Sequence, residues 1–262
     1  MTTWSFGGTA LTDLGRVTIL NDYLDTAERR GENIEIAFRH GRTFAQKYYE
    51  ERVISIGMAI NVASATALEA RLDTIKRLMS IRTQQTLSMT LEDTTVRTTQ
   101  ATLDSPFQIE RKKDSFAMAV FDFRLTKPYF RLSTQTNGTI TMSAGTVTGN
   151  IVNTGTIEEI DPTITMIGPL NNPVITNTLN SHVLSYAGTI AGTVVIQTET
   201  TGEYTAMSNG TANVLGNITH SGGAALMMLN AGGSTNGTNA MSIVNTGGTT
   251  GKIIFSFYPP YL

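Results

Sequence analysis

The chain has 262 residues, a hydrophobic content of 40% and a formal net charge of −2. It contains no cysteine, which excludes a disulfide framework, a thiolate zinc site and a cysteine nucleophile, and its three histidines are too few for a histidine-rich metal centre. The near-neutral charge gives no reason to expect binding to nucleic acid. No apolar stretch approaches the roughly 18–20 residues of a membrane-spanning helix, so we expect no membrane insertion.

Charge divides the chain into two unlike halves. Residues 1–131 hold 18 lysines and arginines and 16 acidic residues, whereas residues 132–262 hold one lysine and five acidic residues. Eighteen of the 24 glycines lie in the second half. So sharp a change predicts two domains, 1–131 and 132–262, with the seam just after Phe130-Arg131.

Two segments of the first half alternate apolar and polar residues. Asn33–Phe38 and Arg52–Val62 each alternate with period two, which predicts strands. In the second segment the large apolar residues share one face, and the other face is small. Gly41 and its cationic neighbours interrupt the pattern as a turn would. We therefore expect the two strands to pair in a large hairpin.

A helical period replaces the alternation after Ser64. Leu68, Leu72, Ile75 and Met79 recur at spacings of four, three and four, which predicts a helix over 66–79. Thr66 followed by Glu69 has the spacing of a capping box at its start.

Three more strands are expected before the seam. They are Thr86–Leu91, Thr94–Thr102 and Phe116–Leu125, the last apolar on both faces as a central strand would be. Pro128 ends that strand because proline cannot donate to a sheet ladder. The basic run Arg111–Lys113 is interpreted as a solvated turn.

The second half predicts an antiparallel sandwich of short strands separated by turns. The expected strands are Ile140–Met142, Thr163–Ile167, Val174–Thr176, Thr193–Gln197, Leu226–Leu229, Met241–Val244 and Lys252–Tyr258. The expected turns are Asn137-Gly138, Gly168-Pro169, Asn209-Gly210 and Gly247-Gly248. The Thr- and Gly-rich stretch 132–160 is interpreted as a connector, either partly extended or a flexible arm.

No catalytic constellation or phosphate-binding loop is present in the sequence, so we expect neither an enzyme nor a cofactor. Glu158, Glu159 and Asp161 could ligate calcium, but a solvated turn is the favoured interpretation. Glu50-Glu51 beside Arg52 indicates an exposed charged stretch rather than an acid–base pair.

Several motifs follow one another in a fixed order along the chain. They are Lys127-Pro128-Tyr129-Phe130-Arg131, Val152-Asn153-Thr154-Gly155, Pro162-Thr163-Ile164-Thr165, Asn172-Pro173-Val174-Ile175-Thr176-Asn177 and the closing Pro259-Pro260-Tyr261-Leu262. This order resembles the distal tail proteins (Dit) of long, non-contractile-tailed phages over nearly the whole chain.

The resemblance implies a mainly β fold, with an N-terminal β-barrel-like domain carrying one helix and a C-terminal galectin-like antiparallel sandwich. It implies a structural virion protein at the distal end of the tail, assembled in the host cytoplasm. The first domains of such proteins form a hexameric ring that joins the tail tube to the tail-tip hub. The second domains face outward and carry receptor-binding or side-fibre proteins. The family has no catalytic, metal or cofactor residues to carry over.

The residues themselves offer a contact for such a ring. Strand edges can pair between copies, and charge patterns favour the correct partner. The 33–62 hairpin, with its charged tip, is therefore the candidate contact between copies or with the tube. Its candidate residues are Arg39, His40, Arg42, Lys47, Glu50, Glu51 and Arg52.

The alternative hypothesis is a carbohydrate-binding or adhesin-type sandwich module of a tail side protein. Sugar sites commonly stack a sugar ring on an aromatic side chain. Residues 132–250 offer only Tyr186 and Tyr204 for this purpose, which argues against sugar binding.

Overall fold

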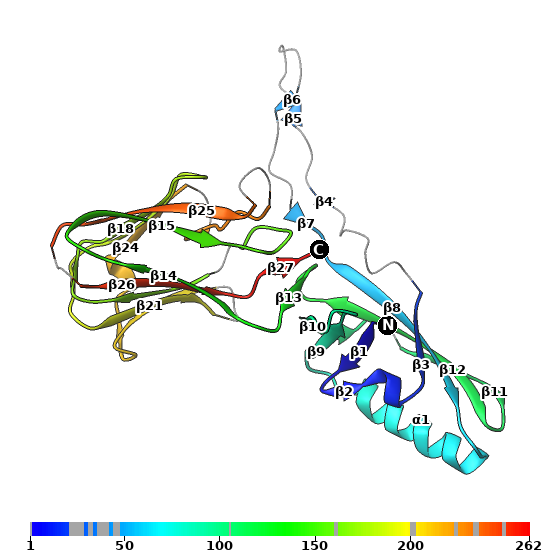
Figure 1. Ribbon diagram of the computed structural model, residues 1–262. Coiled ribbons are helices and arrows are strands. Elements are labelled where there is room, and N and C mark those ends of the chain that lie inside the picture. Colours follow the sequence, from blue (N-terminus) through cyan, green and yellow to red (C-terminus); the bar gives the residue numbers. More distant parts are fainter. Residues whose placement is uncertain are drawn as a thin grey trace. The chain divides into compact units, whose positions relative to one another are not determined.

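The computed structural model describes residues 2–20, 29–30, 34–35, 42–43, 48–104, 106–159, 162–199, 203–222, 225–232, 236–247 and 250–262 (Figure 1). It divides into two compact units, Met1–Ser133 with Leu262, and Thr134–Tyr261. Each unit has its own hydrophobic core. The fold is mainly β with one α-helix in the part of the chain that is described, and both features of the predicted fold class are confirmed.

The first unit is built on one large antiparallel sheet and two two-stranded sheets. Its strands are β1 (Thr3–Phe6), β2 (Thr9–Ala10), β3 (Arg16–Ile19), β4 (Arg29–Arg30), β5 (Ile34–Glu35), β6 (Arg42–Thr43), β7 (Tyr48–Tyr49), β8 (Arg52–Asn61), β9 (Gln85–Thr90), β10 (Val96–Leu103), β11 (Gln108–Lys113), β12 (Phe116–Leu125) and β13 (Phe130–Leu132). The sheet order is β2-β1-β9-β10-β12-β8-β3, with β11 also paired to β12 and β13 to β10. A 3-10 turn, Leu11–Asp13, and helix α1 (Ala65–Met79) complete the unit.

Strands β8 and β12 form the centre of this sheet. They pair along their whole lengths, from Asn61 opposite Phe116 to Arg52 opposite Leu125. Alternate residues of both strands are buried, so the predicted apolar face of β8 is confirmed. The opposite face is less covered than expected for β12, because Met118 is 46% exposed.

The predicted partner of β8 is wrong. Its neighbours are β12 and β3, whereas β5 pairs with β6, with Ile34 opposite Thr43 and Glu35 opposite Arg42. Alternation identifies a strand and its buried face but does not encode which strand lies beside it. The basic run Arg111–Lys113 is likewise the exposed end of β11 rather than a turn.

Helix α1 covers the buried face of the sheet with the four predicted residues, Leu68, Leu72, Ile75 and Met79. The predicted capping box is wrong, because the helix begins at Ala65. The Ser64 hydroxyl accepts a hydrogen bond from the Ala67 amide at 3.2 Å. Glu69 therefore lies beyond the first turn, where it accepts from Nη1 of Arg111 at 2.6 Å.

The second unit is a sandwich of two antiparallel sheets. Its strands are β14 (Thr136–Thr141), β15 (Gly145–Val152), β16 (Thr163–Ile167), β17 (Leu170–Asn171), β18 (Val174–Asn177), β19 (His182–Tyr186), β20 (Thr189–Ile190), β21 (Thr193–Thr198), β22 (Tyr204–Ser208), β23 (Ala212–Asn213), β24 (Ile218–Ser221), β25 (Thr238–Asn245), β26 (Lys252–Phe257) and β27 (Pro260–Tyr261). One sheet has the order β14-β26-β16-β21-β22-β23, and the other β15-β25-β18-β19-β24. Strands β17 and β20 pair separately, and Leu215–Asn217 is a 3-10 turn.

The stretch 132–160 is not the expected connector, because β14 and β15 within it belong to the two facing sheets. Glycine makes this possible. A Cβ at Gly138 would lie 2.5 Å from Cδ1 of Ile151, and one at Gly149 would lie 2.8 Å from Cγ1 of Ile140. Each isoleucine thus fills the space above the other strand's glycine. Asn137-Gly138 lies inside β14 and is not a turn, whereas Asn209-Gly210 is the predicted turn, between β22 and β23.

The predicted strand Leu226–Leu229 is also wrong. The segment buries Leu226, Met227 and Leu229 in the core without joining a sheet. Its only ladder contact among the described residues is an isolated bridge between Leu229 and Glu159. We call residues 225–232 the strap.

Buried asparagine side chains supply the strap's hydrogen bonds. The Asn239 side chain accepts from the Asn230 amide at 2.8 Å and donates to the Asn230 carbonyl at 3.0 Å. Asn177 and Asn180 both donate to the Met228 carbonyl, and Asn153 donates to the Leu229 carbonyl. Side-chain amides therefore replace the missing strand neighbour.

We predict that Ser64→Ala lowers the free energy of unfolding of the first unit by about 1 kcal/mol, because the Ala67 amide loses its acceptor. Trp4, the only tryptophan, is buried in this core, so its fluorescence during urea unfolding reports on this unit. Thr66→Ala is the matched control and should change stability by less than about 0.5 kcal/mol. A larger loss of stability in the Thr66 variant would show that the capping box of Thr66 and Glu69 does form.

We predict that Asn239→Ala destabilises the second unit by about 3 kcal/mol, because several buried backbone groups lose their partners. Backbone amides of the strap should exchange with deuterium faster, as measured by mass spectrometry. Asn150→Ala, at an exposed position of the neighbouring strand β15, should leave exchange of the strap unchanged. Equal exchange in the Asn239 variant and the unaltered chain would show that the side chain does not hold the strap.

Candidate assembly interface

The predicted contact hairpin lies between β3 and β8. In its described parts, β4 pairs with β7 and β5 pairs with β6, both antiparallel. Of the predicted contact residues, Arg42 lies in β6 opposite Glu35. Arg39, His40 and Lys47 lie outside the described residues. The ladders establish a hairpin, and its role as a contact stays a prediction.

The other three predicted contact residues lie at the base of the hairpin, where β7 passes into β8. Glu50 and Glu51 are exposed. Arg52 is only 8% exposed, because it begins β8 on the strand's buried side. The structure thus separates two surface carboxylates from a buried arginine that the sequence grouped with them.

Glu51 is held by a small ion-pair cluster. Nη1 of Arg124 lies 2.6 Å from a Glu51 carboxylate oxygen, and its Nε donates to the Asp104 carboxylate. Hydrogen bonds to Asp104 and then to Glu51 raise the pKa of the Arg124 guanidinium. The cluster joins the start of β8, the end of β12 and the residue after β10.

A shallow cavity of about 360 Å³ lies beside this cluster. It is lined by Tyr49, Glu50, Glu51, Thr126 and Pro128. Because Arg124 already pairs with Glu51, Glu50 is the carboxylate that this cavity offers to a cationic group from outside.

Sequence reasoning missed an apolar patch on the uncovered face of the same sheet. Leu20 is 56% exposed and Met118 is 46% exposed. A Cβ at Gly57 would lie 3.0 Å from Cδ2 of Leu20, so Leu20 packs on β8 only because residue 57 is glycine. The parity of Met118 against buried Ala117 and Ala119 was a usable signal, whereas nothing in the sequence marks Leu20.

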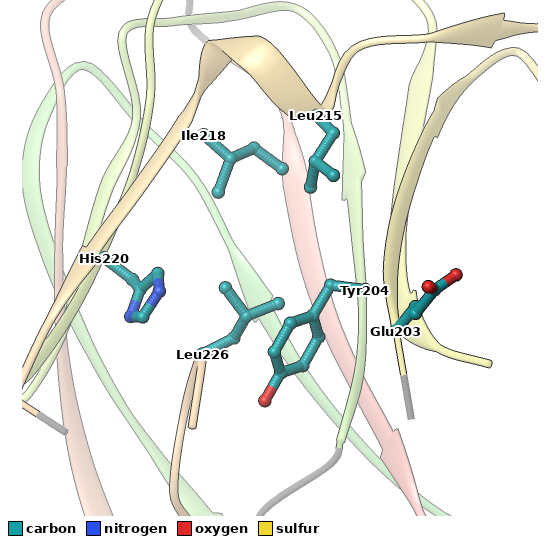
Figure 2. A pocket seen from close by; sticks show the side chains of 6 residues that line it. All are labelled: Glu203, Tyr204, Leu215, Ile218, His220 and Leu226. Carbon is teal, nitrogen blue, oxygen red and sulfur yellow. The ribbon is translucent and has the colours of Figure 1, made fainter. Parts of the chain in front are cut away.

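The second unit carries a larger cavity of about 470 Å³ (Figure 2). It is lined by Glu203, Tyr204, Leu215, Ile218, His220 and Leu226. Tyr204 shares its strand face with buried Ala206. Ile218 and His220 stand opposite the buried Tyr186 and Leu184 in the β19–β24 ladder. Side chains from both sheets therefore face this opening, which we call the mouth of the sandwich.

His182 lies next to the mouth, on β19, and is 4% exposed. Burial lowers the pKa of its imidazole, and the positive charge of His220 lowers it further, against a hydrogen bond with the Ala225 backbone. A Cβ at Gly222 would lie 2.8 Å from the His182 Cα, so glycine is required beside it.

The acidic cluster 158–161 is not assembled as a calcium site. Glu158 is exposed, Glu159 is 1% exposed in its bridge to Leu229, and Asp161 lies outside the described residues. The solvated-turn interpretation is wrong for Glu159. Within the described ranges, no three histidine or acidic side chains are grouped to hold a metal ion. The described helix is also too short and polar to cross a membrane.

Residues 13–124 match a protein family described as phage tail protein RIFT-related domain. The matched range lies within the first unit and includes strands β3 to β11, most of β12 and helix α1.

Comparison with solved structures extends to both units. The chain is similar to the Dit (gp 19.1) protein of phage SPP1, at 14% identity with a TM-score of 0.65, over 100% of both chains. This likeness shows a shared fold, and the predicted resemblance to Dit proteins is confirmed. The chain also matches chains of the phage P2 baseplate with Ca and with Sr, at 8% and 9% identity, 98% coverage of both chains and a TM-score of 0.44. No curated protein sequence matches it.

We predict that the second unit loses stability in acid because of His182. The unfolded chain binds a proton on this residue below its ordinary pKa of 6.5, and the native chain binds it only at lower pH. Stability is therefore complete above pH 6.5 and falls as the pH drops through the lowered pKa. Calorimetric unfolding near neutral pH and at about pH 5 measures the loss.

His182→Gln should flatten this pH dependence, whereas His220→Gln, at an exposed position, should keep most of it. If the His182 variant loses as much stability in acid as the unaltered chain, another group is responsible.

Proposed function

We propose that the chain is a structural protein of a phage tail tip whose copies close into a ring, six in number. The ring joins the tail tube to the tail-tip hub at the distal end of the tail. The RIFT-related domain makes the ring, and the second unit faces outward and carries peripheral or receptor-binding proteins. Assembly takes place in the host cytoplasm.

One observation carries this proposal. The residues that match a phage tail protein family lie in a chain whose whole length shares its fold with a Dit protein. That protein is a paradigm of the hub adsorption apparatus in phages that infect Gram-positive bacteria.

The edges of the first sheet suit a selective contact between copies. Among the described residues, β11 pairs only with β12, and its outer residues Arg111, Lys112 and Lys113 are exposed. Charged side chains on an edge strand oppose unselective pairing. A ring contact at such an edge therefore requires a partner with complementary charge, and the charged hairpin is our candidate for that partner.

We predict that the purified chain has a native mass near six times 28.3 kDa. Replacing residues 31–47 by Asn-Gly leaves Arg30 opposite Tyr48 across a two-residue turn and should give monomers. The Trp4 unfolding curve should stay unchanged, because none of the replaced residues belongs to the described core.

The comparison variant changes Arg111, Lys112 and Lys113 to Ser and leaves the hairpin intact. If both variants keep the ring, neither surface is the contact, and if only the β11 variant loses it, the contact lies at β11. Labelling of intact particles tests the location. A native monomer combined with particles whose tail tip lacks this chain would refute the ring.

A further inference from the structure

The mouth of the sandwich has the make-up of a socket for one long cationic side chain. Leu215, Ile218 and Leu226 give it aliphatic walls, and Tyr204 adds an aromatic ring (Figure 2). Glu203 supplies a carboxylate at the rim. Lysine and arginine bury an aliphatic stem and keep a charged head near water, and a nearby tyrosine ring also attracts cations.

The charge of the second unit favours the same ligand. It holds five acidic residues against a single lysine, Lys252. A basic partner is therefore attracted to this unit and an acidic one is repelled.

Strand β24 adds a backbone edge to the socket. It is the last strand of its sheet, and among the described residues it pairs only with β19. The Ala187 amide donates to the Asn217 carbonyl, next to the β19–β24 ladder. Hydrogen-bonded pairs alternate in antiparallel strands, so Ile218 and His220 form non-bonded pairs with β19. The backbone groups of His220 therefore point to the free edge.

A strand added antiparallel to β24 would complete this geometry. The residue opposite His220 exchanges both backbone hydrogen bonds with it, and its side chain lies on the same face of the sheet. That face is the one that opens into the mouth. An arginine or lysine at this position has its stem among the aliphatic walls and its head directed to the rim.

The geometry points to the mouth and the β24 edge as a docking site for an extended basic segment of another tail protein. The segment adds a strand to β24 and inserts one arginine or lysine between Tyr204 and Leu226, with Glu203 as the counter-charge. This inference rests on the proposed role of the second unit as a carrier of peripheral proteins. It does not depend on ring closure.

The test uses the full chain and the fluorescein-labelled peptide Thr-Val-Arg-Val-Thr, with binding followed by fluorescence polarisation. Two further peptides carry lysine or glutamine in place of the arginine. The arginine and lysine peptides should bind at least about tenfold more tightly than the glutamine peptide, because glutamine cannot form a charged hydrogen bond with Glu203. N-methylation of the arginine amide should also abolish binding, because that amide faces His220.

Variants of the chain assign the contacts. Glu203→Gln and Tyr204→Leu should each weaken the arginine peptide about tenfold. Glu158→Gln removes the same charge from an exposed position outside the mouth and should leave affinity unchanged. Circular dichroism checks that each variant is folded.

Equal binding of the arginine and glutamine peptides, or full affinity in the Glu203 variant, would overturn the proposal. Binding of methyl glycosides that requires Tyr204, without peptide binding, would overturn it in favour of a sugar site. The native mass is measured on the same samples. An intact ring without peptide binding therefore refutes the socket alone. Peptide binding by a chain that is monomeric and missing from the tail tip of particles refutes the ring alone.

Discussion

The pairing of β8 with β12 is the contact on which the first unit depends. Ten residues of each strand meet in one register, and that register decides which side chains enter the core against helix α1. It also brings Arg124 to Glu51 at the base of the hairpin. The same register leaves Met118 on the uncovered face. Core, hairpin base and apolar patch are thus consequences of a single ladder.

The second unit has few charges and many glycines, and other contacts hold it together. Reciprocal packing of Ile140 on Gly149 and of Ile151 on Gly138 lets two facing strands approach closely. Asn239 and its neighbours give the strap hydrogen bonds that no strand provides. At the mouth the edge strands leave space between the sheets, and this space is lined by apolar, aromatic and charged side chains.

The two units therefore differ in the chemistry that they offer. Ion pairs and charged edge strands dominate the surface of the first unit, which suits selective contacts between identical copies. The second unit offers a free strand edge and a pocket with one carboxylate at its rim. Strand addition supplies affinity through the backbone, and a pocket for one side chain supplies selectivity. This division of chemistry agrees with the proposal that the first unit forms the ring and the second carries other proteins.

By itself the sequence determined the mainly β class, the face and extent of the helix, the strand Phe116–Leu125 and several short strands of the sandwich, because each of these depends on local periodicity. Only the tertiary structure decided the partner of β8, the cap at Ser64 and the place of β14 and β15 in two sheets. Glycine at 138 signals a turn when it is considered alone, and it becomes a strand residue because Ile151 occupies the space of its missing side chain. Tyr204 was visible as a rare aromatic residue, but its neighbours in the mouth come from β24 and the strap, far along the chain. Contacts between distant segments carry no local period, and for that reason folding alone settles them.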